Sequence, residues 1–245
     1  MTGKRRSRSR TLADEAYLAV REDILRGQLR PGMPVSRRRL ARELGMSVVP
    51  VTDALKRLEE DGLLETRARA GTRVRVPSET DVRELYELRE ALETQASRLF
   101  AVRATPQQCA EVRRLAADVD ALFSRLATAR DDPAFRFKVH STHLRFHMRI
   151  AECAGSTLLK HMIERRHVLI MNWLFDVSAR RTPLPLGFHA RLAAALTSRD
   201  PAKADAAMRA HVQYGFNEIS GGLRLLDPSE WRERQRHNVA RRSPR

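Results

Sequence analysis

The first 77 residues combine short apolar runs at helical spacing with turns that contain glycine. The pattern predicts a helix over Leu12–Arg26, a short second helix capped by Ser36, and a third helix capped by Ser47. Two runs of strand-like residues, Leu63–Arg67 and Thr72–Val76, predict a hairpin. This order of elements is that of a winged helix-turn-helix, whose third helix can enter the major groove of DNA.

Apolar residues continue at helical spacing beyond Pro77, and no strand pattern interrupts them. Six helices are predicted, over Ser78–Arg103, Thr105–Ala129, Asp132–Ala154, a stretch from Ser156 to about Phe175, Phe188–Thr197 and Asp200–Gly221. We therefore expect a mainly α protein, with an N-terminal winged helix-turn-helix and a C-terminal all-α six-helix bundle. The predicted domains cover residues 11–77 and 78–227, between tails at 1–10 and 228–245.

The composition indicates a folded protein with a polyanionic partner. Of 245 residues, 42% are hydrophobic, and the formal net charge is +16. Residues 1–10 contain five bases and no acid, and residues 228–245 contain six bases and two acids. These basic tails either attract phosphates or only increase solubility. Two cysteines exclude a disulfide scaffold, and the longest apolar run is too short to span a bilayer. We expect a cytoplasmic protein with no membrane partner.

Four segments of the first domain carry a resemblance to a known family. They read ILRGQLRPG, LARELGMS, PVTDALKRLEEDGLL and GTRVRV, and they resemble the DNA-binding domain of GntR-type bacterial regulators from Thr11 to Val76. Two later segments, ELYELREALETQASRLFA and GFHARLAAALTSRDPAKADAAMRAHV, resemble the FCD effector domain of the FadR branch. The resemblance implies a transcriptional regulator that binds double-stranded operator DNA as a homodimer.

The resemblance implies DNA contacts from the second helix, the third helix and the wing. Arg38 stands where the family has a DNA-contacting arginine, whereas Val48 and Thr52 replace two arginines of the family pattern. An arginine can bind guanine, but a valine can contact only a thymine methyl, so we expect a different operator. Alternatively, Val48 and Val49 only extend the core. The predicted DNA-binding residues are Arg37, Arg38, Arg39, Ser47, Val48, Val49, Thr52, Lys56, Arg69, Gly71 and Arg73.

Histidines form a possible metal site in the second domain. His143 and His147 share one helix face with His140 a turn earlier, and His189 and His211 lie on two later helices. This spacing alone also fits exposed or hydrogen-bonded core histidines. The FCD resemblance implies metal ligation by His147, His189 and His211, with His143 at the position of the family aspartate. Four neutral ligands favour zinc or nickel; alternatively, loss of the carboxylate leaves the metal weakly held or absent.

The resemblance also assigns Arg89 to an effector pocket, where its guanidinium would bind a small carboxylic acid. The alternative is a surface ion pair between Arg89 and Glu93. The sequence does not place Arg145 or Asn172. We expect a ligand-controlled regulator, a repressor and not an enzyme. A metalloenzyme tethered to DNA is the first rival, although the chain has no His-Glu-x-x-His motif. A DNA binder without a ligand response is the second.

Overall fold

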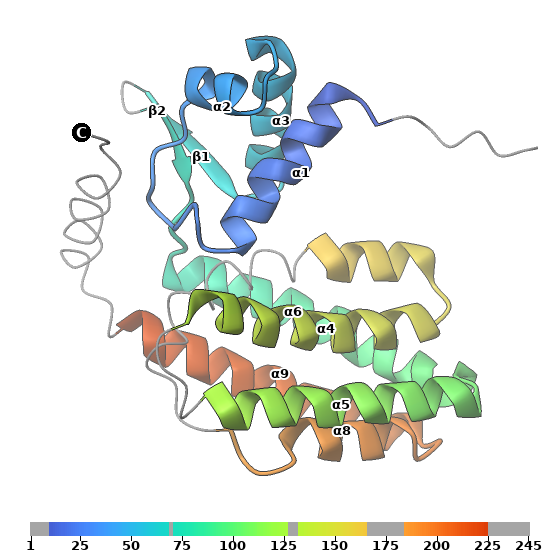
Figure 1. Cartoon of the computed structure of the whole chain (residues 1–245). Coiled ribbons are helices and arrows are strands. Elements are labelled where there is room, and N and C mark those ends of the chain that lie inside the picture. The colour runs from blue at the N-terminus through green and yellow to red at the C-terminus, as the bar shows by residue number, and fades with distance from the viewer. Residues whose placement is uncertain (1–9, 69–70, 127–131, 166–183, 225–245) are drawn as a thin grey trace, which may run out of the picture. The chain divides into compact units, whose positions relative to one another are not determined.

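The computed structural model describes residues 10–68, 71–126, 132–165 and 184–224 (Figure 1). Contacts within the chain divide it into two compact units, and the main division falls between Arg75 and Val76. The first unit combines helices with a hairpin, and the second contains only helices among its described residues. The structure thus confirms the predicted fold class.

The first unit has the element order of a winged helix-turn-helix. Its elements are α1 (Leu12–Leu25), α2 (Arg37–Glu43), α3 (Val48–Glu60), β1 (Leu64–Arg67) and β2 (Gly71–Val74). The two strands pair antiparallel, with Leu64 opposite Val74. Pro34 adds an isolated bridge to Arg73, which the sequence pattern did not predict.

Helix α3 owes its position to one apolar face and to the turn before it. Its buried residues recur at positions i, i+3, i+4 and i+7, and they are Val51, Ala54, Leu55 and Leu58. Gly45 provides the turn between α2 and α3 with a φ of +64°, a conformation that favours glycine. The Ser36 side chain caps α2, as predicted. The prediction for Ser47 was wrong in part, because its backbone occupies the N-cap position of α3 but its side chain makes no capping hydrogen bond.

Two polar contacts join α1 to the C-terminal half of α3. The Tyr17 hydroxyl donates to Asp61 over 2.7 Å, and Arg57 Nη1 lies 2.7 Å from Asp14 Oδ1. Burial, followed by the hydrogen bond to Asp61, raises the pKa of Tyr17 to about 12. Hydrogen bonding from Arg57 lowers the pKa of Asp14 to about 2. These contacts fix α3 against α1 and leave its N-terminal end for other partners.

The second unit is a bundle of helices. Its elements are α4 (Glu79–Arg103), α5 (Pro106–Leu126), α6 (Pro133–Cys153), a helix described over 157–165, α8 (Phe188–Leu196) and α9 (Pro201–Arg224). A capping box between Ser78 and Asp81 begins α4, and the Asp132 side chain caps α6, so both helices begin where the sequence predicts. The rest of the predicted fourth helix, to about Phe175, lies outside the described residues.

Packing within the bundle brings polar side chains into its interior. Helix α4 packs along α9, α5 packs along α6, and α8 contacts both α5 and α9 (Figure 1). Large apolar side chains such as Phe100 and Phe146 are fully buried. Buried beside them are polar groups that are seldom buried unless they have partners, among them Arg89, Glu93, His140, His147, His189 and His211. Among the described residues, no helix is long and apolar enough to cross a membrane.

Candidate DNA-binding surface and metal centre

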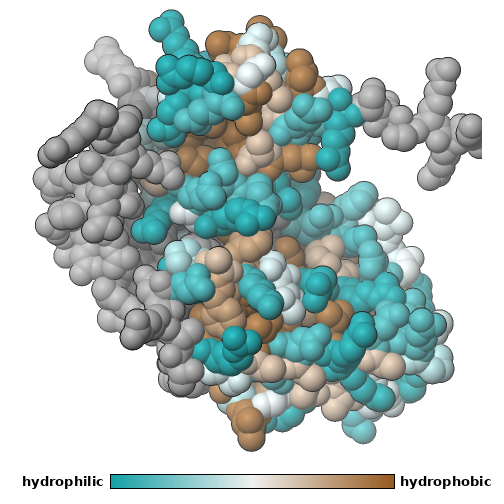
Figure 2. Space-filling view, in the orientation of Figure 1, coloured by the Kyte–Doolittle hydropathy of each residue, from teal (hydrophilic) through white to brown (hydrophobic). Residues whose placement is uncertain are grey.

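The N-terminal end of α3 presents apolar side chains to solvent. Val48 is 45% exposed and Val49 is 70% exposed, so neither residue extends the core. The Thr52 hydroxyl donates to the Val48 carbonyl over 2.9 Å, which satisfies a polar group within the helix. Figure 2 shows hydrophobic surface among hydrophilic side chains where α2 meets α3. This end of α3 can therefore contact thymine methyl groups.

The other predicted DNA-binding residues come from α2, α3 and the hairpin, and they differ in their exposure to solvent. Arg37, Arg38 and Lys56 are exposed, whereas Arg39 is half-buried, with its Nε 3.5 Å from Glu43. Gly71 begins β2 with a φ of +74°, and Arg73 lies half-buried on the same strand. Arg69 lies outside the described residues.

Four imidazole rings converge inside the bundle from α6, α8 and α9. His147 Nε2 lies 2.9 Å from His143 Nε2 and 3.1 Å from His211 Nε2. His143, His189 and His211 each present a nitrogen within 4.8 Å of the other two. The four predicted metal ligands are thus brought together. His140 is also buried, and its ring centroid lies 6.1 Å from that of Phe123.

Two carboxylates contact the outer nitrogens of this histidine cluster. Asp120 Oδ1 lies 2.7 Å from His189 Nδ1 and also accepts the His189 backbone N–H. Glu93 Oε2 lies 2.5 Å from His147 Nδ1. When a carboxylate contacts Nδ1, it favours the tautomer whose Nε2 is free to bind a metal. The sequence analysis did not identify either residue as part of the site.

Two histidines of the cluster, His143 and His211, are held in their neutral form. Burial lowers the pKa of His143 and that of His211 well below the ordinary value of 6.5, and the neighbouring histidines lower both further. Neutral imidazole is the form that binds metal. Nitrogen ligands about 2.0–2.1 Å from a metal lie about 2.9–3.4 Å apart, which matches the two short separations at His147. The donor set therefore fits a divalent transition metal.

Arg89 is buried beside the cluster and not on the surface. Its side chain is 4% exposed, and its Nε donates to Glu93 Oε1. The predicted pair of Arg89 with Glu93 thus exists, but in the interior. Burial lowers the pKa of Arg89, but the neighbouring Glu93 and Tyr86 together raise it by more, so the pKa lies above its ordinary value.

A small cavity joins Arg89 to the histidines. Its volume is about 30 Å³, and its lining comprises Tyr86, Arg89, Phe123, His143, Leu184, Phe188, His189, His211, Tyr214 and Gly215. This is room for about one or two water molecules. A Cβ atom added to Gly215 would lie 3.3 Å from the Tyr86 hydroxyl, so the glycine preserves this space. A carboxylic acid can enter only if the surrounding side chains move.

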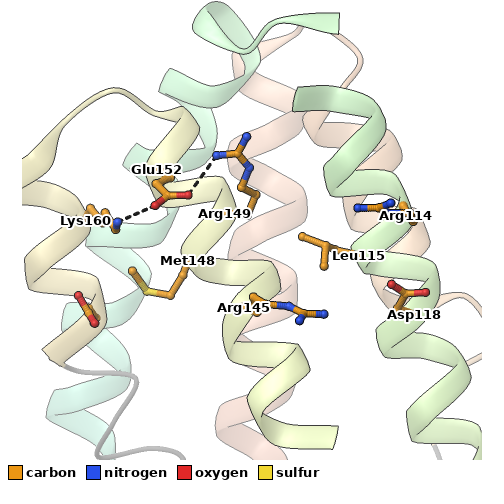
Figure 3. Close-up of a pocket in the computed structure, with 9 residues that line it drawn as sticks. Arg114, Leu115, Asp118, Arg145, Met148, Arg149, Glu152 and Lys160 are labelled. Carbon is orange, nitrogen blue, oxygen red and sulfur yellow. Dashed lines mark hydrogen bonds and ion pairs between the residues drawn. The ribbon is translucent and has the colours of Figure 1, made fainter. Parts of the chain in front are cut away.

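Arg145 faces a different hollow on the outside of the bundle. Figure 3 shows it with Arg114 and Leu115 between α5 and α6, in a groove of about 490 Å³. The basic groups at the other end of this groove are already paired, since Arg149 and Lys160 both contact Glu152. Arg145 therefore does not line the histidine cavity, and Asn172 lies outside the described residues.

The fold defines a class of protein, a regulator with a winged helix-turn-helix for DNA binding and a helical second domain. Residues 12–74 match the bacterial regulatory proteins of the gntR family, and residues 84–214 match the FCD domain. The chain belongs to the GntR family of transcriptional regulators and carries an FCD domain. This confirms the resemblance found in the sequence.

Similar proteins agree with this assignment. A protein of Paenarthrobacter nicotinovorans, called probable D-xylose utilization operon transcriptional repressor, is 41% identical over 100 residues, which span 41% of this chain and 44% of that relative. The Nta operon transcriptional regulator of Aminobacter aminovorans is 31% identical over 78% of this chain and 86% of its own length. The structure titled E. coli McbR/YncC shares the fold, with a TM-score of 0.70 at 22% identity, over 86% of this chain and 98% of that one. The first two of these relatives are named as transcriptional regulators.

The lowered histidine pKa values predict that acid destabilises the metal-free protein. Unfolded histidines take up protons below about pH 6.5, whereas His143 and His211 resist protonation in the fold. The free energy of unfolding should therefore fall as the pH drops from about 7 to about 5. Urea unfolding at several pH values measures this, and His211→Asn should flatten the dependence. If the free energy of unfolding depends on pH equally in wild type and His211→Asn, the lowered pKa of His211 is contradicted.

Proposed function

We propose that this chain is a repressor whose affinity for operator DNA is controlled by a small carboxylic acid. The acid binds to Arg89, beside a zinc or nickel ion held by His143, His147, His189 and His211. The observation that carries the proposal is the convergence of these four imidazoles next to one buried guanidinium. The chain acts as a homodimer on a two-fold symmetric operator, as its DNA-binding domain suggests.

The electrostatics of the site support an anionic effector. Four neutral ligands leave the charge of the metal uncompensated within its coordination sphere, and Arg89 adds a second positive charge nearby. Glu93 and Asp120 offset part of this charge from outside the ligand shell. A carboxylate with one oxygen on the metal and another on Arg89 would neutralise further positive charge at the site.

The size of the cavity supports control by a shift between two states. Because about 30 Å³ cannot hold a sugar acid or a dicarboxylate, the effector must bind a state in which the cavity is larger. Differential affinity for two states is the requirement for a ligand to change DNA binding. Phe188 lines the cavity from the first residue of α8, so effector entry would displace this helix or its side chains.

The metalloenzyme alternative lacks support at the cluster. A metal-bound water needs a general base within reach, and the described carboxylates that contact the cluster are Glu93 and Asp120. Both of them contact imidazole nitrogens. The geometry therefore favours ligand binding over hydrolysis.

The metal is tested by elemental analysis of the purified full chain. Wild-type protein should contain one equivalent of zinc or nickel, and His147→Ala should lose most of it, because His147 lies at the centre of the short nitrogen separations. His161→Ala is the matched control, since His161 is exposed on the neighbouring helix. A wild type without metal, even after incubation with zinc, would refute this part of the proposal.

The effector is tested by thermal unfolding of zinc-loaded protein with a panel of sugar acids and dicarboxylates. At least one acid should raise the unfolding temperature in proportion to its concentration and weaken operator binding. Arg89→Gln should abolish both effects while the protein still binds DNA. If every acid leaves both measurements unchanged, the chain is a DNA binder without this ligand response.

The operator is tested by selecting bound DNA from a random pool. Exposed Val48 and Val49 predict inverted repeats whose half-sites depend on thymine more than the ordinary family operator does. A double variant with Val48→Arg and Thr52→Arg should shift the selected half-sites towards guanine. Arg37→Ala is the control, and it should lower affinity without changing the sequence preference. Selection of the ordinary family operator by the wild type would contradict the altered readout.

A further inference from the structure

The Glu93 carboxylate contacts both Arg89 and His147, each through one of its two oxygens. Its Oε1 accepts a hydrogen bond from Arg89 Nε, one turn earlier on α4. Its Oε2 lies 2.5 Å from His147 Nδ1 on α6. The Glu93 side chain is 3% exposed, so water does not screen either contact appreciably.

Asp120 provides a contrast within the same cluster. It contacts Nδ1 of His189 and accepts backbone N–H groups of His189 and Ala190, so all of its contacts given by the structure serve the start of α8. It is also less buried than Glu93, with 18% of its side chain exposed. Asp120 therefore positions one histidine, whereas Glu93 contacts a histidine and the guanidinium.

Arg89 contacts Glu93 through its Nε, and Tyr86 is a second hydrogen-bonding neighbour of the guanidinium. Its Nη1 lies 3.7 Å from the point that a Cβ on Gly215 would occupy, and Arg89, Gly215 and His211 line the same cavity. The ring of Tyr86 lies beside the guanidinium, with Cζ 5.2 Å from the ring centroid. An anion in the cavity would therefore meet a guanidinium that also contacts Glu93.

We propose that Glu93 is a positioning residue that couples an anion bound at Arg89 to a metal bound at His147. This inference rests on the proposed function, and it concerns how the two ligands influence each other. Glu93 holds the His147 ring with Nε2 towards the other histidines, and Arg89 competes for the negative charge of the same carboxylate.

The direction of the coupling follows from these charges. While Arg89 carries its full positive charge, it draws the Glu93 carboxylate towards itself and weakens the electrostatic support of His147. An anion on the cavity edge of Arg89 offsets that charge, so Glu93 supports His147 and the metal more strongly. By thermodynamic linkage, the metal then strengthens anion binding by the same factor.

The first test measures zinc affinity of the full chain by competition with a chelator, without any effector. Glu93→Gln should lower zinc affinity by about 10–100-fold, the usual effect of removing a carboxylate behind a ligating histidine. Asp120→Asn should lower zinc affinity by a similar factor. Glu93→Asp should also lower zinc affinity, because the shorter side chain withdraws the carboxylate oxygens from His147. Circular dichroism of each variant confirms the fold, and if Glu93→Gln does not fold, Glu93→Asp serves as the test.

The second test separates coupling through Glu93 from direct repulsion between Arg89 and the metal. Arg89→Gln should tighten zinc binding by about fivefold or more when Glu93 is present. The same change should have clearly less effect in the Glu93→Gln background, but its full effect in the Asp120→Asn background. A double-mutant cycle reports this difference directly.

The outcomes distinguish this inference from the proposed function. Suppose that wild type binds zinc and that Asp120→Asn lowers zinc affinity while Glu93→Gln does not. In that case the metal site stands and the role of Glu93 is refuted. If the effect of Arg89→Gln is the same with and without Glu93, the coupling is refuted. If wild type binds no zinc, the proposed metal site fails and this inference fails with it.

Discussion

The second domain depends on four imidazoles packed together inside a helical bundle. Like-charged rings could not remain in such contact, and the lowered pKa values of His143 and His211 reflect this repulsion together with burial. The arrangement also costs desolvation, since each ring nitrogen removed from water needs a partner. Asp120 hydrogen-bonds to one outer nitrogen and Glu93 contacts another, and the converging nitrogens form a donor set suited to a metal.

This constraint explains several features of the bundle. Helix α6 contributes His143 and His147 one turn apart, while α8 and α9 each contribute one histidine. Helix α4 brings Arg89 and Glu93 to the same place, also one turn apart. Because α4, α6, α8 and α9 all contribute residues to this site, a ligand that changes the spacing of these residues would also move the helices relative to one another.

The sequence predicted the helices, the hairpin and the four converging histidines because these depend on local spacing and on a family resemblance. It did not separate a surface Arg89 from a buried one, since the same i, i+4 spacing from Glu93 serves both. The role of Asp120 was also beyond prediction, because its contact with His189 joins residues far apart in the chain. Exposure of Val48 and Val49 needed the structure too, as apolar residues at a helix start fit a core equally well.

The most direct test of the account is X-ray absorption spectroscopy of the zinc-loaded full chain. The account predicts a first shell rich in nitrogen at about 2.0–2.1 Å, with the outer-shell scattering of several imidazole rings. That imidazole signal should fall in His143→Ala and in His211→Ala. A first shell of oxygen or sulfur without imidazole scattering would contradict the central claim that the four histidines form the metal centre.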